Sequence, residues 1–160
     1  MIREVKLVLI AAGVVTLLGI AAGILLLNPQ EVESSEVSFK AVEPVDVARV
    51  SIDNEHGAFD ITFTGEGYRV GDIPAELVDV QELIDLLTYC GKVAALRTVA
   101  TQPEDLGRYG LTDPNARVEI TYLDESTLTL IIGDVERGSK QTYFRVEGDP
   151  AVYLMESRRT

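Results

Sequence analysis

One run of residues constrains this chain most strongly: residues 7–27 carry no charge, and thirteen of the twenty-one are Leu, Ile or Val. As an α-helix this run would extend about 31 Å, and the hydrocarbon core of a bilayer is about 30 Å thick. Backbone polar groups in lipid must be paired within their own segment, which favours a helix. We therefore predict a single transmembrane helix over residues 7–27, ended by Asn28-Pro29 because proline disfavours helix in the residue before it.

The charges on either side of this run predict its orientation. Arg3 and Lys6 precede it, and the first basic residue after it is Lys40. Because the cytoplasmic flanks of membrane helices are rich in Lys and Arg, residues 1–6 should form a cytoplasmic stub. We expect a single-pass protein of the inner or plasma membrane with a periplasmic or extracellular C-terminal domain.

A cleaved signal peptide is the alternative interpretation. Its apolar region would span only about 7–15 residues and lead into small residues at the cleavage site. Here the run is longer and ends in Leu25, Leu26 and Leu27, and no cysteine near it offers a lipoprotein anchor. These features favour an uncleaved anchor.

Small residues share one face of the predicted membrane helix. Ala12, Thr16, Gly19 and Gly23 recur at helical spacing, and the last two form a Gly-x-x-x-Gly pair. Such a pair lets two membrane helices approach closely, so this face is a candidate contact with a membrane protein partner. The alternative is that small residues are simply common in membrane helices.

The chain beyond the run is acidic. Of the 26 acidic and 14 basic residues in the sequence, 25 and 12 lie after residue 27. A nucleic-acid partner needs basic surface to neutralise phosphates, so we expect none. Adhesion of this part to anionic lipid is disfavoured for the same reason.

The remaining sequence divides into a polar linker over residues 28–44, a folded domain over 45–156 and a short tail over 157–160. Apolar and polar residues alternate in several short segments separated by turn residues, which predicts strands. The alternating segments lie near residues 47–54, 59–63, 68–70, 93–99, 117–122, 128–132, 142–146 and 152–154. The first three form a hairpin unit, and the last four form a β-meander.

One helix is predicted, over residues 80–90. Asp79 can cap its first turn, Glu82 completes a pair resembling a capping box, and Gly91 provides the stop. Its apolar face comprises Val80, Leu83, Ile84 and Leu87.

A turn-rich corner precedes the meander. It contains Tyr109, Gly110, Leu111, Asp113 and Pro114. We expect a positive φ at Gly110 and a turn at Asp113-Pro114. The corner is a candidate partner contact, and the alternative is a packing corner with Leu111 buried.

Several segments of the second half together resemble a bacterial family of domains of unknown function. The matching segments are Asp105-Leu106, Tyr109-Gly110-Leu111, Asp113-Pro114, Ile132-Gly133, Tyr143-Phe144-Arg145-Val146 and Val152-Tyr153-Leu154. Genes of that family often lie beside components of gliding-motility-type ABC transporters. The resemblance covers residues 45–156 and implies a membrane helix, an extracytoplasmic repeated α+β domain and an accessory role. It supplies no catalytic residues.

Two departures from that family stand out. Tyr68 occupies a position where relatives usually have Trp, and the chain has one domain where many relatives are longer. A function that needs repeated domains is therefore not implied.

No pattern specifies a reaction, a metal or a cofactor. The sequence lacks a nucleophile elbow, a phosphate loop, zinc-ligand spacing and paired cysteines. His56 lies near Asp53, Glu55 and Asp60, which is compatible with a cation site or with an ordinary polar turn. Cys90 has no partner for an intramolecular disulfide, so it is a small buried apolar residue or forms an intermolecular bridge.

These observations predict an α+β protein: a transmembrane helix followed by two antiparallel hairpin or meander units linked by the 80–90 helix. The expected function is a non-enzymatic accessory subunit of a membrane protein complex, with an ABC-type exporter as one candidate. The alternative is a stand-alone binding module for envelope glycan or peptide. Its surface would use outward residues of the meander, namely Arg117, Arg137, Lys140 and Arg145. Nothing in the sequence decides the oligomeric state.

Overall fold

The computed structural model describes residues 36–157. The transmembrane helix predicted over residues 7–27, with its face of Ala12, Thr16, Gly19 and Gly23, lies outside these residues. Within the described part, no helix has the length and apolar character needed to cross a membrane.

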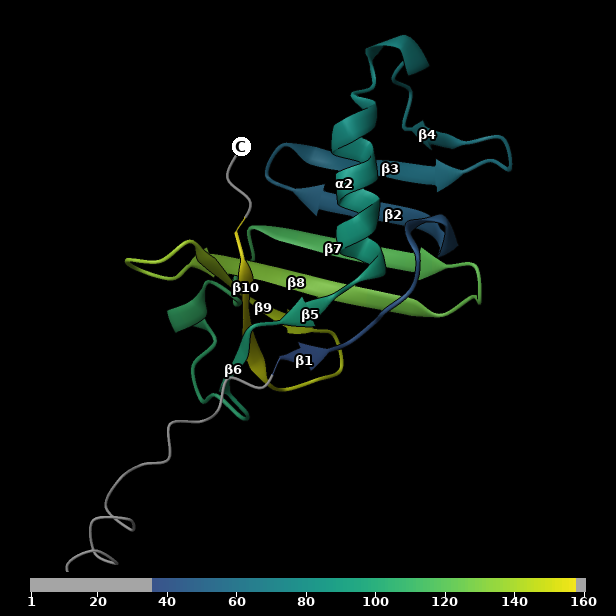
Figure 1. Ribbon diagram of the computed structural model, residues 1–160. Coiled ribbons are helices and arrows are strands. Elements are labelled where there is room, and N and C mark those ends of the chain that lie inside the picture. Colours follow the sequence, from purple (N-terminus) through teal and green to yellow (C-terminus); the bar gives the residue numbers. More distant parts are fainter. Residues whose placement is uncertain (1–35, 158–160) are drawn as a thin grey trace, which may run out of the picture. The chain divides into compact units, whose positions relative to one another are not determined.

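One antiparallel sheet of eight strands dominates the domain (Figure 1). Its strands in spatial order are β4 (Tyr68–Val70), β3 (Gly57–Phe63), β2 (Val47–Asn54), β7 (Ala116–Tyr122), β8 (Thr127–Val135), β9 (Gln141–Val146), β10 (Val152–Glu156) and β6 (Arg97–Ala100). A separate two-stranded sheet pairs β1 (Val37–Ser38) with β5 (Ala94–Ala95). Three short 3-10 helices are η1 (Pro44–Asp46), η2 (Ala75–Leu77) and η3 (Gly107–Tyr109).

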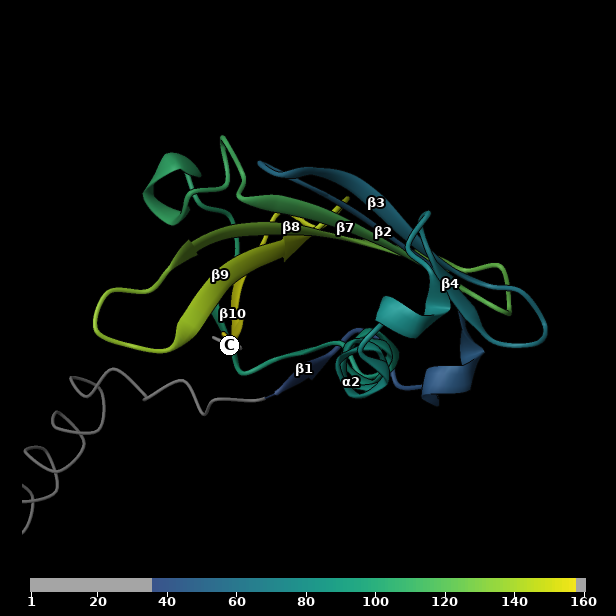
Figure 2. The same cartoon turned by 90° about the horizontal axis from the view of Figure 1, so that it is seen from above.

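The one α-helix among residues 36–157, α2 (Val80–Gly91), lies on the concave side of the curved sheet (Figure 2). It begins where the sequence predicts, because the Asp79 carboxylate accepts hydrogen bonds from the backbone N–H groups of Gln81 and Glu82 at 2.9 and 3.1 Å. These bonds satisfy two of the orphan donors of the first turn. The helix ends at Gly91, one residue later than predicted.

The core lies between α2 and the concave face. The strand register aligns Val50 with Ile61 and Ile120, so alternation on each strand places apolar side chains on this face. The largest fully buried side chains are Phe144, Ile120, Leu154, Val47, Val50 and Val152. The opposite face of the central strands carries polar and charged residues, as expected for an antiparallel sheet with one solvated face.

Residues 36–44, which the sequence analysis assigned to the linker, pack against the domain. The Phe39 ring packs edge-on against Phe144 and Tyr153, with centroid distances of 5.9 and 4.9 Å. The backbone N–H groups of Phe39 and Val42 donate to the carbonyls of Val93 and Gly91, both at 2.8 Å. This segment therefore runs beside the end of α2 and helps cover the core.

The predicted α+β class, with two units linked by a helix, is wrong. The domain is β-rich, because β2 of the first hairpin pairs along its length with β7 of the meander and merges both units into one sheet. The helix covers this sheet and does not separate two units.

Candidate functional site

An apolar groove lies beside the first half of α2 and is the strongest candidate for a functional surface. We call it the α2 groove. It has a volume of about 490 Å³. Its lining residues are Pro44, Val45, Tyr68, Ala75, Val78, Val80, Leu83, Ile84 and Leu87. They come from four parts of the chain, namely η1, β4, the η2 segment and α2.

The groove is open because α2 buries only part of its apolar face. Leu87 is 4% exposed, whereas Val80 and Ile84 on the same helix are 63% and 48% exposed. On the adjoining segments Val45 and Leu77 are 67% and 75% exposed. Monomeric proteins rarely leave large apolar residues clustered in water, and such patches mark interaction surfaces.

The polar parts of the groove wall are already engaged. The Tyr68 hydroxyl donates toward the backbone carbonyls of Val47 and Pro44, at 2.7 and 3.1 Å. Burial raises the pKa of this hydroxyl, with a further contribution from the charge of Asp46. Tyr68 therefore presents ring carbon to the groove and remains a neutral phenol.

Acidic residues flank the α2 groove. Glu76 and Asp79 adjoin the lining residues Ala75, Val78 and Val80 in sequence, whereas helical spacing places Glu82 and Asp85 away from the groove face of α2. On the other side, η1 and its cap add Glu43 and Asp46. An apolar surface with this rim favours a ligand that is apolar in the middle and positively charged at its edges.

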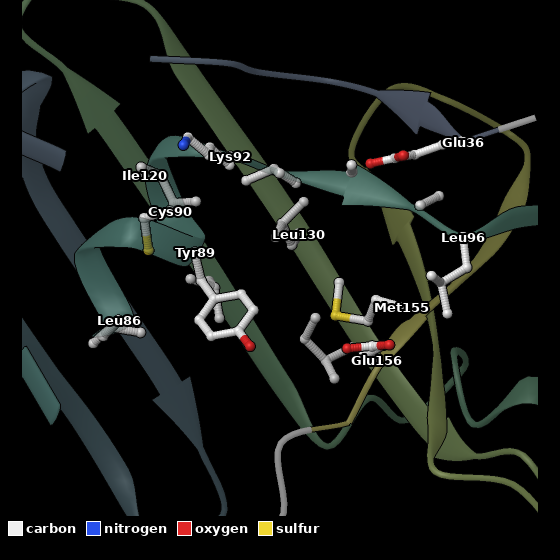
Figure 3. A pocket seen from close by; sticks show the side chains of 15 residues that line it. Glu36, Leu86, Tyr89, Cys90, Lys92, Leu96, Ile120, Leu130, Met155 and Glu156 are labelled. Atoms are coloured by element: carbon white, nitrogen blue, oxygen red, sulfur yellow. The ribbon is translucent and has the colours of Figure 1, made fainter. Parts of the chain in front are cut away.

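A second hollow, which we call the apolar pocket, lies where the end of α2 and strand β5 face the sheet (Figure 3). It has a volume of about 430 Å³, within the range of small-molecule sites. Its lining residues are Glu36, Leu86, Tyr89, Cys90, Lys92, Val93, Ala94, Ala95, Leu96, Val118, Ile120, Leu130, Ile132, Met155 and Glu156. Only Glu36, Lys92 and Glu156 in this lining carry a charge at neutral pH.

Cys90 in the apolar pocket is not an activated nucleophile. Burial raises the pKa of its thiol to about 12, so the thiol stays protonated at neutral pH. Reactive cysteines instead need an environment that stabilises the thiolate. The predicted buried Cys90 is confirmed, since its side chain is 4% exposed.

The corner around Tyr109 packs against the end of β8. The positive φ predicted for Gly110 is confirmed at 68°, and Leu111 is 6% exposed. A Cβ added at Gly133 would lie 2.1 Å from the Tyr109 carbonyl oxygen, which shows how closely the two segments approach. Asp113 and Pro114 are exposed at the edge of the corner. The geometry agrees with the packing interpretation.

The remaining candidates do not assemble into a site. His56 lies 3.5 Å from the Glu55 carboxylate on an exposed turn. Across residues 36–157 no group of three or more His, Cys, Asp or Glu side chains is placed to hold a metal ion. Of the four basic meander residues, Arg117 and Arg145 share the polar face of the sheet, and Arg137 and Lys140 lie in the β8–β9 loop.

Sequence reasoning missed both hollows. Periodicity identifies the apolar residues of α2 but does not reveal which of them the sheet covers. One signal was present in the sequence. Between residues 70 and 91 there are five acidic residues and no basic one, and the large apolar residues Ile73 and Leu77 lie among them.

The fold and its hollows define a β-rich domain with one uncovered helix face. Residues 69–159 match the family described as "Domain of unknown function (DUF4340)". Because the match covers more than half of the 160 residues, the chain belongs to that family. Membership of a family of domains of unknown function was predicted from the sequence and is confirmed. No curated protein and no solved structure matches the chain.

Proposed function

We propose that this protein is a non-enzymatic accessory subunit of a membrane protein complex. The observation that carries the proposal is the uncovered apolar face of α2, where Val80 and Ile84 border a groove of about 490 Å³. Surfaces of this kind mark protein–protein contacts. A transporter of the gliding-motility ABC type is the candidate complex, by the family resemblance described above.

The uncharged run at residues 7–27 supports attachment to the inner or plasma membrane, with the domain on the periplasmic or extracellular side. Residues 28–35 between this run and the domain span at most about 28 Å when fully extended. A tether of this length would let the domain meet the extramembrane parts of a neighbouring membrane protein.

Affinity purification of the full-length protein from native membranes in mild detergent tests the proposal. We expect a reproducible membrane protein partner, identified by mass spectrometry, that is lost with the double substitution Val80→Ser and Ile84→Ser. Val135→Ser is the matched control, because Val135 is also an exposed apolar residue but is not part of the groove. Recovery of the protein alone under several detergents would contradict the proposal.

A stand-alone module for envelope glycan or peptide is the second candidate. The register Arg117–Ile131–Arg145 places two guanidinium groups on the polar face of β7 and β9. Arg117 is held by Glu147, at 2.6 and 2.7 Å, and the buried Nε of Arg145 has no hydrogen-bond partner. Glycan and peptide arrays probed with the full-length protein test this function, and no binding on any array would remove it.

A further inference from the structure

The α2 groove recognises apolar groups and little else. All nine lining side chains are apolar or, in Tyr68, have their hydroxyl bonded to backbone carbonyls. Leu87 is buried and Leu83 is half-buried, whereas Val45, Val80 and Ile84 are exposed. Binding here therefore gains from burial of apolar side chains of the partner.

The charge around the groove selects among apolar partners. Four acidic residues adjoin its lining, namely Glu43, Asp46, Glu76 and Asp79; of these Asp79 caps α2, and Glu43 and Asp46 form a capping box at η1. The nearest basic residues in sequence are Lys40, Arg49, Arg69 and Lys92. Lys40 and Arg49 are paired with Asp124 and Asp60, at 3.0 and 2.9 Å. Alternation on β4 puts Arg69 on the sheet face opposite Tyr68, and Lys92 follows the far end of α2.

Two apolar occupants are disfavoured by this charge. An anionic bilayer surface would be repelled by the acidic rim. A second copy of this chain, docking by two-fold symmetry, would bring the same acidic rim against itself, and like charges across an interface oppose binding.

We propose that the α2 groove binds an amphipathic segment of a partner protein, helical in form, whose apolar side chains enter the groove and whose Lys or Arg residues meet the acidic rim. Helix-in-groove recognition uses apolar anchors at i, i+3, i+4 and i+7, and complementary charge raises the association rate. This inference rests on the proposed function and names the chemistry of its partner.

A photo-crosslinking experiment with the full-length protein in discs of zwitterionic lipid tests it. The probe is a synthetic helical peptide of about 18 residues, with Leu at helical spacing, Lys elsewhere and a photoreactive leucine at one apolar position. Mass spectrometry maps the crosslinks on the protein, so peptide that binds only lipid is not counted. We expect crosslinks on residues 75–87, with a yield that falls at least about fivefold between about 0.05 M and about 0.5 M NaCl.

Two sets of variants and a second peptide separate the apolar and charge contributions. Val80→Ser with Ile84→Ser should abolish these crosslinks. Glu43→Gln with Glu76→Gln should lower their yield about fivefold, because two exposed rim charges are lost while the Gln side chain at residue 43 keeps an acceptor for the η1 cap. Glu104→Gln with Glu125→Gln makes the same charge change outside the rim and should leave the yield unchanged. A peptide with Glu in place of Lys should not crosslink to the groove.

The outcomes distinguish this inference from the proposed function. Equal crosslinking by the Lys and Glu peptides, or a yield independent of salt, would overturn the inference and leave the accessory role intact. Absence of groove crosslinks with correctly folded protein, checked by thermal unfolding, would overturn the inference as well. The accessory role itself fails only if purification from native membranes recovers no partner.

Discussion

Gly110 shows how one residue sets the approach of two segments. Its φ of 68° is in the left-handed region, and a Cβ added there would lie 2.5 Å from the Cγ atom of Asp134. Gly110→Ala therefore combines backbone strain with a clash, and we expect the free energy of unfolding to fall by more than about 1 kcal/mol. Urea unfolding measures the loss.

Gly138 provides the matched control for this substitution. It has a φ of +82°, and an added Cβ there would meet no atom within 4 Å. Gly138→Ala should carry the backbone strain alone and lower stability less than Gly110→Ala. Equal losses in the two variants would show that the approach to Asp134 adds nothing.

Tyr122 joins the sheet to the end of α2 through one buried hydrogen bond. Its hydroxyl donates to the Cys90 carbonyl at 2.9 Å, and the residue is 2% exposed. Tyr122→Phe should lower the free energy of unfolding by about 1 kcal/mol, since a buried acceptor loses its partner. Tyr109→Phe removes a hydroxyl from a half-buried ring and should cost less. A loss near zero for Tyr122→Phe in urea unfolding would contradict the importance of this bond.

At the scale of elements, the start of α2 depends on Asp79. Asp79→Ala removes the acceptor for two backbone N–H groups and should cost about 1 kcal/mol of stability. Asp79→Asn keeps a side-chain oxygen at the cap while removing the charge, so it should retain most of that stability. Urea unfolding followed by far-ultraviolet circular dichroism compares both variants with the wild type. Equal losses for Asn and Ala would show that charge, and not capping, is the main contribution.

Local pattern predicted most elements of this domain but not their pairing. Alternation placed strands near residues 47–54 and 117–122, and both exist as β2 and β7. Their sequences resemble each other, and the structure makes them antiparallel neighbours, with Val50 opposite Ile120. Periodicity reports which face of a strand is apolar, whereas the neighbour of a strand depends on contacts between distant residues. This is why two units were predicted where one sheet exists.

The same limit applies to the candidate site. The helical spacing of Val80, Leu83, Ile84 and Leu87 correctly identified the apolar face of α2. How much of that face the sheet covers depends on the curvature of the sheet and on where β4 ends, and neither can be read from a period of 3.6 residues. The corner at Gly110 was better predicted, because its turn residues act locally.

At the scale of the whole molecule, both halves of the chain contribute strands to one sheet. The free energy of unfolding therefore depends on ionisable side chains from both halves. Burial raises the pKa of the Cys90 thiol and of the Tyr153 hydroxyl to about 12, from ordinary values of 9.0 and 10.0. Asp149, which accepts the Tyr153 hydroxyl hydrogen bond at 2.7 Å, adds to the second shift. Both groups are therefore held in their neutral, protonated form by the fold.

This arrangement predicts a loss of stability in alkali. Between pH 9.0 and about 12 the unfolded chain releases the Cys90 proton while the native state keeps it, so the unfolded state binds fewer protons. Stability then falls as pH rises, by at most about 1.4 kcal/mol per pH unit for one proton. Tyr153 adds to the fall above pH 10.0. Urea unfolding at a series of pH values should show a free energy of unfolding that declines steeply above pH 9.

Cys90→Ala tests which group produces that decline. The variant loses a buried sulfur, so its stability at neutral pH should be lower, but it has no thiol proton to release. The slope of stability against pH between pH 9 and pH 10 should therefore be shallower than in the wild type, because the hydroxyl of Tyr153 releases its proton only at higher pH. An unchanged slope would mean that proton release from the Cys90 thiol does not affect the free energy of unfolding. The loss of stability in alkali would then come from the tyrosines alone.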